Sequence, residues 1–226
     1  MDDFDLSDFD GVCRLFPLPE LVQFPHSVLP LHVFEPRYRQ MTEDALATDK
    51  LLTIVQLRPQ GELNELGIRA IEKSACLGRI IRHERLPDGR FRLLLHGLCR
   101  VRLLEEIPSA KLYRIARAIL MPDRDLESPS IDPSVLSVAC RAFLVKTRGR
   151  IEPELEAMLS SPLPLGILAD IVSQAMPLPA EAKQMLLDED DPAMRARMLL
   201  EWIARVVPPA VAGGPRSDFP PPFSMN

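Results

Sequence analysis

Residues 68–104, which read IRAIEKSACLGRIIRHERLPDGRFRLLLHGLCRVRLL, decide the fold. Within them Pro87-Asp88-Gly89 is turn chemistry, because Asp and Gly tolerate the positive φ that a tight hairpin needs. After the turn, Phe91 and Leu93 alternate with other residues at the period of a half-buried strand. The stretch therefore predicts a β-hairpin in which Gly97 marks a bulge or a tight bend. Its strands are expected over residues 68–86, with a break around Ser74, and over 90–104.

Shorter apolar runs on both sides of the hairpin predict the rest of a sheet. They cover residues 12–16, 28–34, 51–57 and 112–120. The second run contains Pro30, which has no N–H to donate, so this strand is predicted to lie at an edge or to carry a bulge. Pro36 follows it and suits the first position of a helix. Tyr38 and Met41 begin the apolar stripe of that helix.

After residue 131 the apolar period changes from two residues to about 3.6, which predicts helices. Asp132-Pro133 and Asp191-Pro192 each combine an N-cap residue with a proline at the first helical position. Gly149 suits a C-terminal cap. Five helices are expected, beginning near residues 132, 153, 161, 179 and 191.

These patterns divide the chain into five segments. They are an acidic, disordered tip over residues 1–11, a β-rich subdomain over 12–121, a linker over 122–131, a helical subdomain over 132–207 and a disordered tail over 208–226. The tail is rich in Pro and Gly and shows no apolar period, so it is not expected to fold.

The composition limits the class of protein and its partners. With 46% hydrophobic residues, the 226-residue chain can bury a substantial core. The net charge is −5, and residues 1–10 hold five Asp and no basic residue, so the remainder is neutral and nucleic acid is not an expected partner. No apolar run approaches the ~18 residues that cross a bilayer, and the acidic N-terminus is not a targeting signal. We therefore expect a cytoplasmic protein with no membrane partner.

The sequence predicts no catalytic activity, no metal site and no cofactor. The cysteines are Cys13, Cys76, Cys99 and Cys140. None forms a C-x-x-C pair, and we interpret them as buried free thiols in a reducing cytoplasm. Cys76 with His83, and His96 with Cys99, are separated by odd numbers of residues, which predicts opposite faces of a strand rather than a shared metal site. The chain also lacks a P-loop and the G-x-S-x-G, H-E-x-x-H and G-x-G-x-x-G motifs.

Four groups of residues follow a known pattern in order and spacing. They are LFPL at 15–18 with QFP at 23–25 and LPLHVFEPRY at 29–38; CLGRI at 76–80 with LPDGR at 86–90; HGLCRV at 96–101; and LAD at 168–170 with KQMLL at 183–187. Together they resemble the N-terminal, substrate-binding domain of the Lon protease family.

The resemblance implies an α+β fold, with an N-terminal PUA-like β pseudo-barrel followed by a C-terminal helical bundle. It also implies a stand-alone domain of the kind found in bacteria, because the chain stops where the ATPase module and the Ser–Lys peptidase module of the full-length protease would begin. The ATP hydrolysis and proteolysis of the family are therefore not expected here, and the protein is predicted to be no enzyme.

The resemblance suggests a module that binds unfolded proteins or peptides, through apolar anchors and the main chain of a strand edge. The candidate contact residues are Phe24, Leu29, Leu31, Phe34 and Tyr38. The alternative is that most of them simply pack the barrel. An adaptor or regulator that acts with a separate protease is a further hypothesis.

A second hypothesis is RNA binding, because PUA-like barrels include RNA-binding proteins. Residues 79–102 hold seven arginines against two acids, and Arg90 with Arg92, like Arg100 with Arg102, would share a strand face. The alternative is a solvated hairpin. Binding of RNA through these arginines would weaken steeply with salt, whereas apolar peptide binding would not.

Overall fold

In the described part of the chain the sheet has six strands, which form close to the predicted runs. They are β1 (Val12–Leu18), β2 (Val28–Val33), β3 (Leu51–Gln56), β4 (Ser74–Arg85), β5 (Phe91–Ile107) and β6 (Ile115–Leu120). Gly89 in the β4–β5 turn has a φ of 80°, and the register shifts opposite Gly97, as predicted for both glycines. One prediction is wrong at its start: residues 68–73 form only isolated bridges to the segment after β3, so β4 begins at Ser74.

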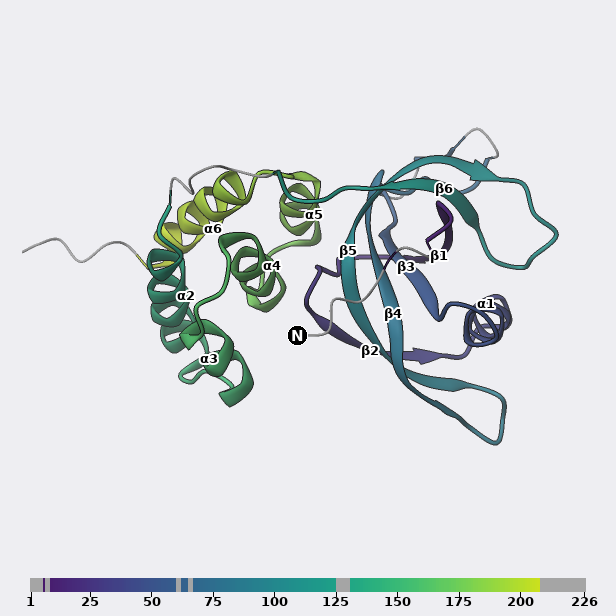
Figure 1. Cartoon of the computed structure of the whole chain (residues 1–226), viewed down its shortest axis with the longest axis horizontal. Helices are drawn as coiled ribbons and strands as arrows, with labels where there is room; N and C mark the ends of the chain where they lie inside the picture. The colour runs from purple at the N-terminus through teal and green to yellow at the C-terminus, as the bar shows by residue number, and fades with distance from the viewer. Residues whose placement is uncertain (1–5, 7–8, 60–61, 65–66, 125–130, 208–226) are drawn as a thin grey trace, which may run out of the picture.

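Five of the strands close into a barrel (Figure 1). The sheet order is β2-β5-β4-β3-β1-β6, and a further β5–β6 pairing joins the ends of the ring. β5 allows this closure because it has 17 residues, of which the first part pairs with β2 and the second part with β6. Among the described residues β2 pairs with β5 alone, so it is an edge strand, as Pro30 predicts.

Helix α1 (Pro36–Leu46) packs on the barrel with the predicted apolar stripe. Tyr38 and Met41 are buried in a cluster that includes Phe16 of β1 and Leu95 of β5. The rings of Phe16 and Tyr38 lie 4.2 Å apart between centroids. α1 therefore completes the core on the side of the barrel that faces away from the other helices (Figure 1).

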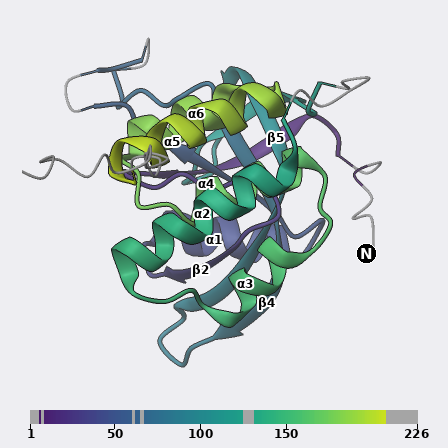
Figure 2. The same ribbon diagram turned by 90° about the vertical axis from the view of Figure 1, so that its left-hand side faces the viewer.

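The remaining helices form a bundle after the barrel. They are α2 (Pro133–Arg148), α3 (Pro153–Ser160), α4 (Leu165–Ala175), α5 (Ala180–Asp188) and α6 (Pro192–Val206). Asp132 accepts a hydrogen bond from the Ser134 N–H at the start of α2, Gly149 ends that helix in the left-handed region, and Asp191 caps α6. Each of these caps was expected from the sequence. Figure 2 shows the bundle in front of the barrel, on the side opposite α1.

A segment of the β-rich part contributes to the core of the bundle. Val22 and Phe24, in the segment between β1 and β2, belong to the buried cluster formed by α2 to α6. The Phe24 N–H also donates to Gln174 Oε1 of α4 at 3.1 Å. A barrel segment therefore inserts an aromatic anchor into the helical core, which fixes the two parts against each other.

This computed structural model describes residues 6, 9–59, 62–64, 67–124 and 131–207. Most of the predicted acidic tip, the middle of the predicted linker and the tail after residue 207 lie outside them. Within the described ranges no helix is both long and apolar enough to cross a membrane.

Candidate functional site

One edge of β2 faces away from the sheet and offers main-chain groups. Pro30 lies opposite Leu94 in a regular antiparallel register, and a proline fits a ladder only where its nitrogen faces away from the partner strand. Such positions alternate along a strand, so Val28 and His32 also turn their main-chain groups outward. The edge therefore presents two N–H groups and three carbonyl groups to solvent.

A shallow groove of about 810 Å³ lies beside this edge, on the outer face of the β2–β5–β4 sheet. The strand register sets two rows of side chains across it. They are Pro30, Leu94 and Arg82 in one row, and His32, Arg92 and Glu84 in the next. The first row is largely apolar and the second is polar, so the groove can accept an apolar side chain next to a polar one.

The five predicted peptide-contact residues differ in how far they are exposed. Phe34 is 60% exposed, and its ring contacts that of His32 beside the groove. Leu29 and Leu31 are half-buried on the core-facing side of β2. Phe24 and Tyr38 are buried, Phe24 completely, because they fill the bundle core and the barrel core. This corrects the prediction, and both are excluded from the contact surface.

The four arginines of the RNA-binding hypothesis are not brought together. Arg90 and Arg92, near the hairpin turn, pair with Asp88 and Glu84. Arg102 is exposed near the other end of β5 and donates to the sulfur of a methionine. Arg100 is buried and ion-paired, so it cannot reach a phosphate. This placement corrects the expectation of a shared exposed face for Arg100 and Arg102.

Arg100 belongs to a buried ion cluster between the barrel and the bundle. Arg100 donates to Asp123 at 3.0 Å and to Asp170 of α4, and Arg195 of α6 donates to Asp123 at 2.7 and 2.8 Å. Burial raises the pKa of Asp170 to about 6, against the opposing effect of the two guanidinium groups. The cluster thus links β5 to α4 and α6, and removing one of its members would leave an opposite charge buried without its partner.

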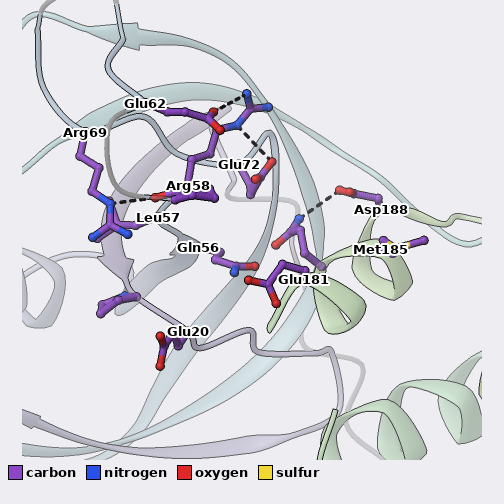
Figure 3. Close-up of a pocket in the computed structure, with 13 residues that line it drawn as sticks. Glu20, Gln56, Leu57, Arg58, Glu62, Arg69, Glu72, Glu181, Met185 and Asp188 are labelled. Carbon is purple, nitrogen blue, oxygen red and sulfur yellow. Dashed lines mark hydrogen bonds and ion pairs between the residues drawn. The ribbon is translucent and has the colours of Figure 1, made fainter. Parts of the chain in front are cut away.

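A second concavity, of about 690 Å³, lies between the barrel and α5 (Figure 3). Gln56 and Arg58 line it from the end of β3 and the following loop, and Glu181 and Met185 line it from α5. The sequence analysis missed this cleft, since its walls are distant in sequence: Gln184 of α5 donates to the main chain of β4 across 110 residues.

The described residues hold no metal-binding cluster of His, Cys, Asp and Glu side chains. No three His, Cys, Asp or Glu side chains there could hold a metal ion together. The four cysteines are unbonded; three are buried and Cys99 is half-buried. Burial raises the pKa of Cys13 to about 11, that of Cys99 to about 12 and that of Cys76 well above its ordinary value. These three thiols therefore stay protonated at neutral pH.

Comparison with known proteins agrees with the predicted resemblance. Residues 12–205 match the family described as the ATP-dependent protease La (LON) substrate-binding domain. The Lon protease of Desulfatibacillum aliphaticivorans is 26% identical over 204 residues, which cover 88% of this chain and 24% of that protein. The Lon protease of Escherichia coli K12 is 28% identical over 192 residues and is covered to 24%. The chain thus spans about a quarter of the length of these relatives.

Two solved structures support the predicted α+β fold. The Lon N-terminal domain protein from Xanthomonas campestris superposes with a TM-score of 0.63 at 21% identity, covering 84% of this chain and 98% of that chain. The N-terminal domain of the Mycobacterium avium complex Lon protease gives a TM-score of 0.65 at 17% identity, covering 85% and 98%. At these identities the agreement concerns the fold alone.

Proposed function

Because this chain belongs to the family of Lon substrate-binding domains, we propose that it binds unfolded or extended polypeptide segments at the open edge of β2. The observation that carries the proposal is the position of β2, an edge strand with an adjoining groove. The chain holds its ligand rather than cutting it. In the finer form of the proposal it is an adaptor or regulator that presents such segments to a separate protease.

The proposed binding mode adds the ligand to the sheet as a further strand. The outward N–H groups of Val28 and His32 donate to ligand carbonyl groups, and the outward carbonyl groups of β2 accept from ligand N–H groups. These contacts use only the main chain, so they suit segments of many sequences. Leu94 supplies an apolar contact in the groove and the exposed Phe34 supplies another beside it, which favours segments from the interior of an unfolded protein.

Pro30 has a second role in this proposal. It removes one donor from the middle of the edge, which weakens pairing of the edge with a second copy of the same chain. A flexible ligand can shift around one missing hydrogen bond, whereas two rigid β2 edges cannot. The edge can thus stay open to ligands without driving self-association.

The proposal is tested by fluorescence anisotropy with a labelled, permanently unfolded polypeptide at low and high salt. We expect saturable binding that tolerates salt, because main-chain and apolar contacts carry it. His32→Pro removes one outward N–H and should weaken binding about fivefold, the effect of one hydrogen bond. Phe34→Ala should also weaken it, and the matched control Val145→Ala, which shortens an exposed apolar residue on α2, should not.

A labelled single-stranded RNA is titrated in parallel. Binding of RNA that falls steeply with salt, together with no binding of the polypeptide, would overturn the proposal. Polypeptide binding that is unaffected by both β2-edge variants would also overturn it, because the ligand would then lie elsewhere.

A further inference from the structure

The cleft between the barrel and α5 is lined by carboxylates that form no ion pair with a described residue. Five acidic residues and two arginines line it. Arg58 pairs with two of the carboxylates at 3.3 and 3.4 Å, whereas Arg69 donates to the Arg58 carbonyl oxygen at 2.8 Å and pairs with no carboxylate among the described residues (Figure 3). The carboxylates of Glu20, Glu181 and Asp188 also line the cleft, and none forms an ion pair with a residue that the structure describes. The cleft is therefore suited to a cation.

Two buried glutamines on the same walls each carry an acceptor with no donor. Gln56 is 8% exposed and Gln184 is 5% exposed, and neither Oε1 atom accepts a hydrogen bond. The amide of Gln184 cannot be reversed, because its Nε2 donates to the Ser74 carbonyl oxygen and to Asp188 Oδ1, both at 3.0 Å. Buried acceptors without donors are rare in native proteins because they cost free energy. These two indicate that a donor group from outside the chain completes the cleft.

The arrangement favours an organic cation with several donors over a metal ion. No three carboxylates in the described part of the chain lie close enough together to hold a metal. Figure 3 shows Gln56 and Glu181 pointing toward one another from the barrel and from α5, so a ligand between them meets an amide and a carboxylate on opposite sides. A guanidinium group is planar and has five N–H donors, which can serve carboxylate and amide oxygens together.

We propose that this cleft binds an arginine side chain of the polypeptide ligand. The inference rests on the proposed function for the source of the arginine, but the site itself can be tested with a small probe. Turning the terminal amide of Gln56 toward the guanidinium satisfies its oxygen, and Glu181 supplies the charge. The exposed Met185 side chain, a flexible thioether, covers the aliphatic part of the ligand.

The test uses methyl-labelled methionine NMR on the whole chain, with N-acetyl-L-arginine amide as the probe. The Met185 methyl resonance, assigned with Met185→Leu, should shift saturably as the probe is added. The matched citrulline amide, which has the same shape without the charge, should bind at least about tenfold more weakly, because charge-assisted hydrogen bonds are the stronger kind. The double variant Glu181→Gln with Asp188→Asn should weaken binding of the arginine probe by a similar factor.

Glu154→Gln combined with Glu201→Gln is the matched control, since it removes two acidic charges that form no ion pair with a described residue, from α3 and α6, and leaves the cleft unchanged. An unshifted Met185 resonance, equal binding of arginine and citrulline, or equal weakening in the control would overturn the inference. Its failure is distinguishable from failure of the proposed function. If unfolded polypeptide binds at β2 without any preference for arginine, only the proposed arginine site in the cleft is refuted. Probe binding without polypeptide binding refutes the proposed function alone.

Discussion

Phe24→Ala separates a structural role of this residue from a role in binding. Phe24 is completely buried in the core of the helical bundle, although it precedes β2 in the chain. A buried Phe removes roughly 150 Å² or more of apolar surface from water, and at about 25 cal/mol per Å² this is worth about 4 kcal/mol. Measured Phe→Ala losses in protein cores are about 3–5 kcal/mol. We expect a loss of about 4 kcal/mol in the free energy of unfolding.

The loss is measured by urea unfolding, followed by circular dichroism and by Trp202 fluorescence. Trp202 of α6 packs against the same cluster as Phe24, so it reports on the core that the substitution opens. Phe34→Ala is the matched control: its ring is 60% exposed, and its removal should cost less than about 1 kcal/mol. The unfolding curves should therefore separate the two phenylalanines clearly.

Binding of unfolded polypeptide is measured for the same two variants. Phe34→Ala should weaken binding with little effect on stability. Phe24→Ala should lower the stability but, under conditions where the protein stays folded, should leave binding almost unchanged. A Phe24→Ala protein that is as stable as the parent but binds polypeptide poorly would refute the reasoning. It would mean that Phe24 lies at the surface in solution.

Three further predictions concern other parts of the chain. Gly166→Ala should cost about 2 kcal/mol in urea unfolding, because the added Cβ would clash with Asp123 Oδ2; a gain in stability would contradict this. Burial raises the pKa of Glu106, but the hydrogen bonds from Arg114 lower it, and overall the pKa lies below its ordinary value of 4.5. Glu106 therefore contributes stability that is fully present above pH 4.5 and is lost as the pH falls through its pKa in the folded protein. Glu106→Gln should flatten the acid side of a stability–pH curve, and an unchanged curve would count against the pairing. Burial raises the pKa of the Cys76 thiol well above 9.0, so a thiol reagent at neutral pH should react with it only after unfolding; fast labelling of the native protein would show that it is accessible.

Local patterns were sufficient for the elements but not for their packing. The Asp88-Gly89 turn, the edge position of Pro30 and the caps at Asp132 and Asp191 each depend on residues close together in sequence, and each forms as predicted. Burial of Arg100 could not be predicted in this way, since its partner Asp170 lies 70 residues away. Strand alternation alone placed Arg100 beside the exposed Arg102, because alternation gives no sign of the helices that cover that face.

The surface proposed as the candidate site depends on local and non-local features in the same way. Edge-strand chemistry indicated β2 and Phe34, because a proline within an apolar run has a local meaning. Phe24 and Tyr38 are buried because other elements cover them. Which element covers each residue depends on the assembled fold, not on the nearby sequence. The cleft beside α5 has no local sequence pattern at all, since its floor combines β3, the loop that follows it and a helix from the other end of the chain.

The position of Phe24 also has a consequence for biosynthesis. Its partner Gln174 is 150 residues further along the chain, so a ribosome adding roughly 5–20 residues per second makes the partner about 8–30 s after Phe24. During that time the barrel strands up to Leu120 can emerge and pair, while Val22 and Phe24 lack the helices that cover them. The nascent chain thus carries an uncovered apolar segment directly before the open β2 edge. The segment stays uncovered until α4 and α6 emerge and pack against it.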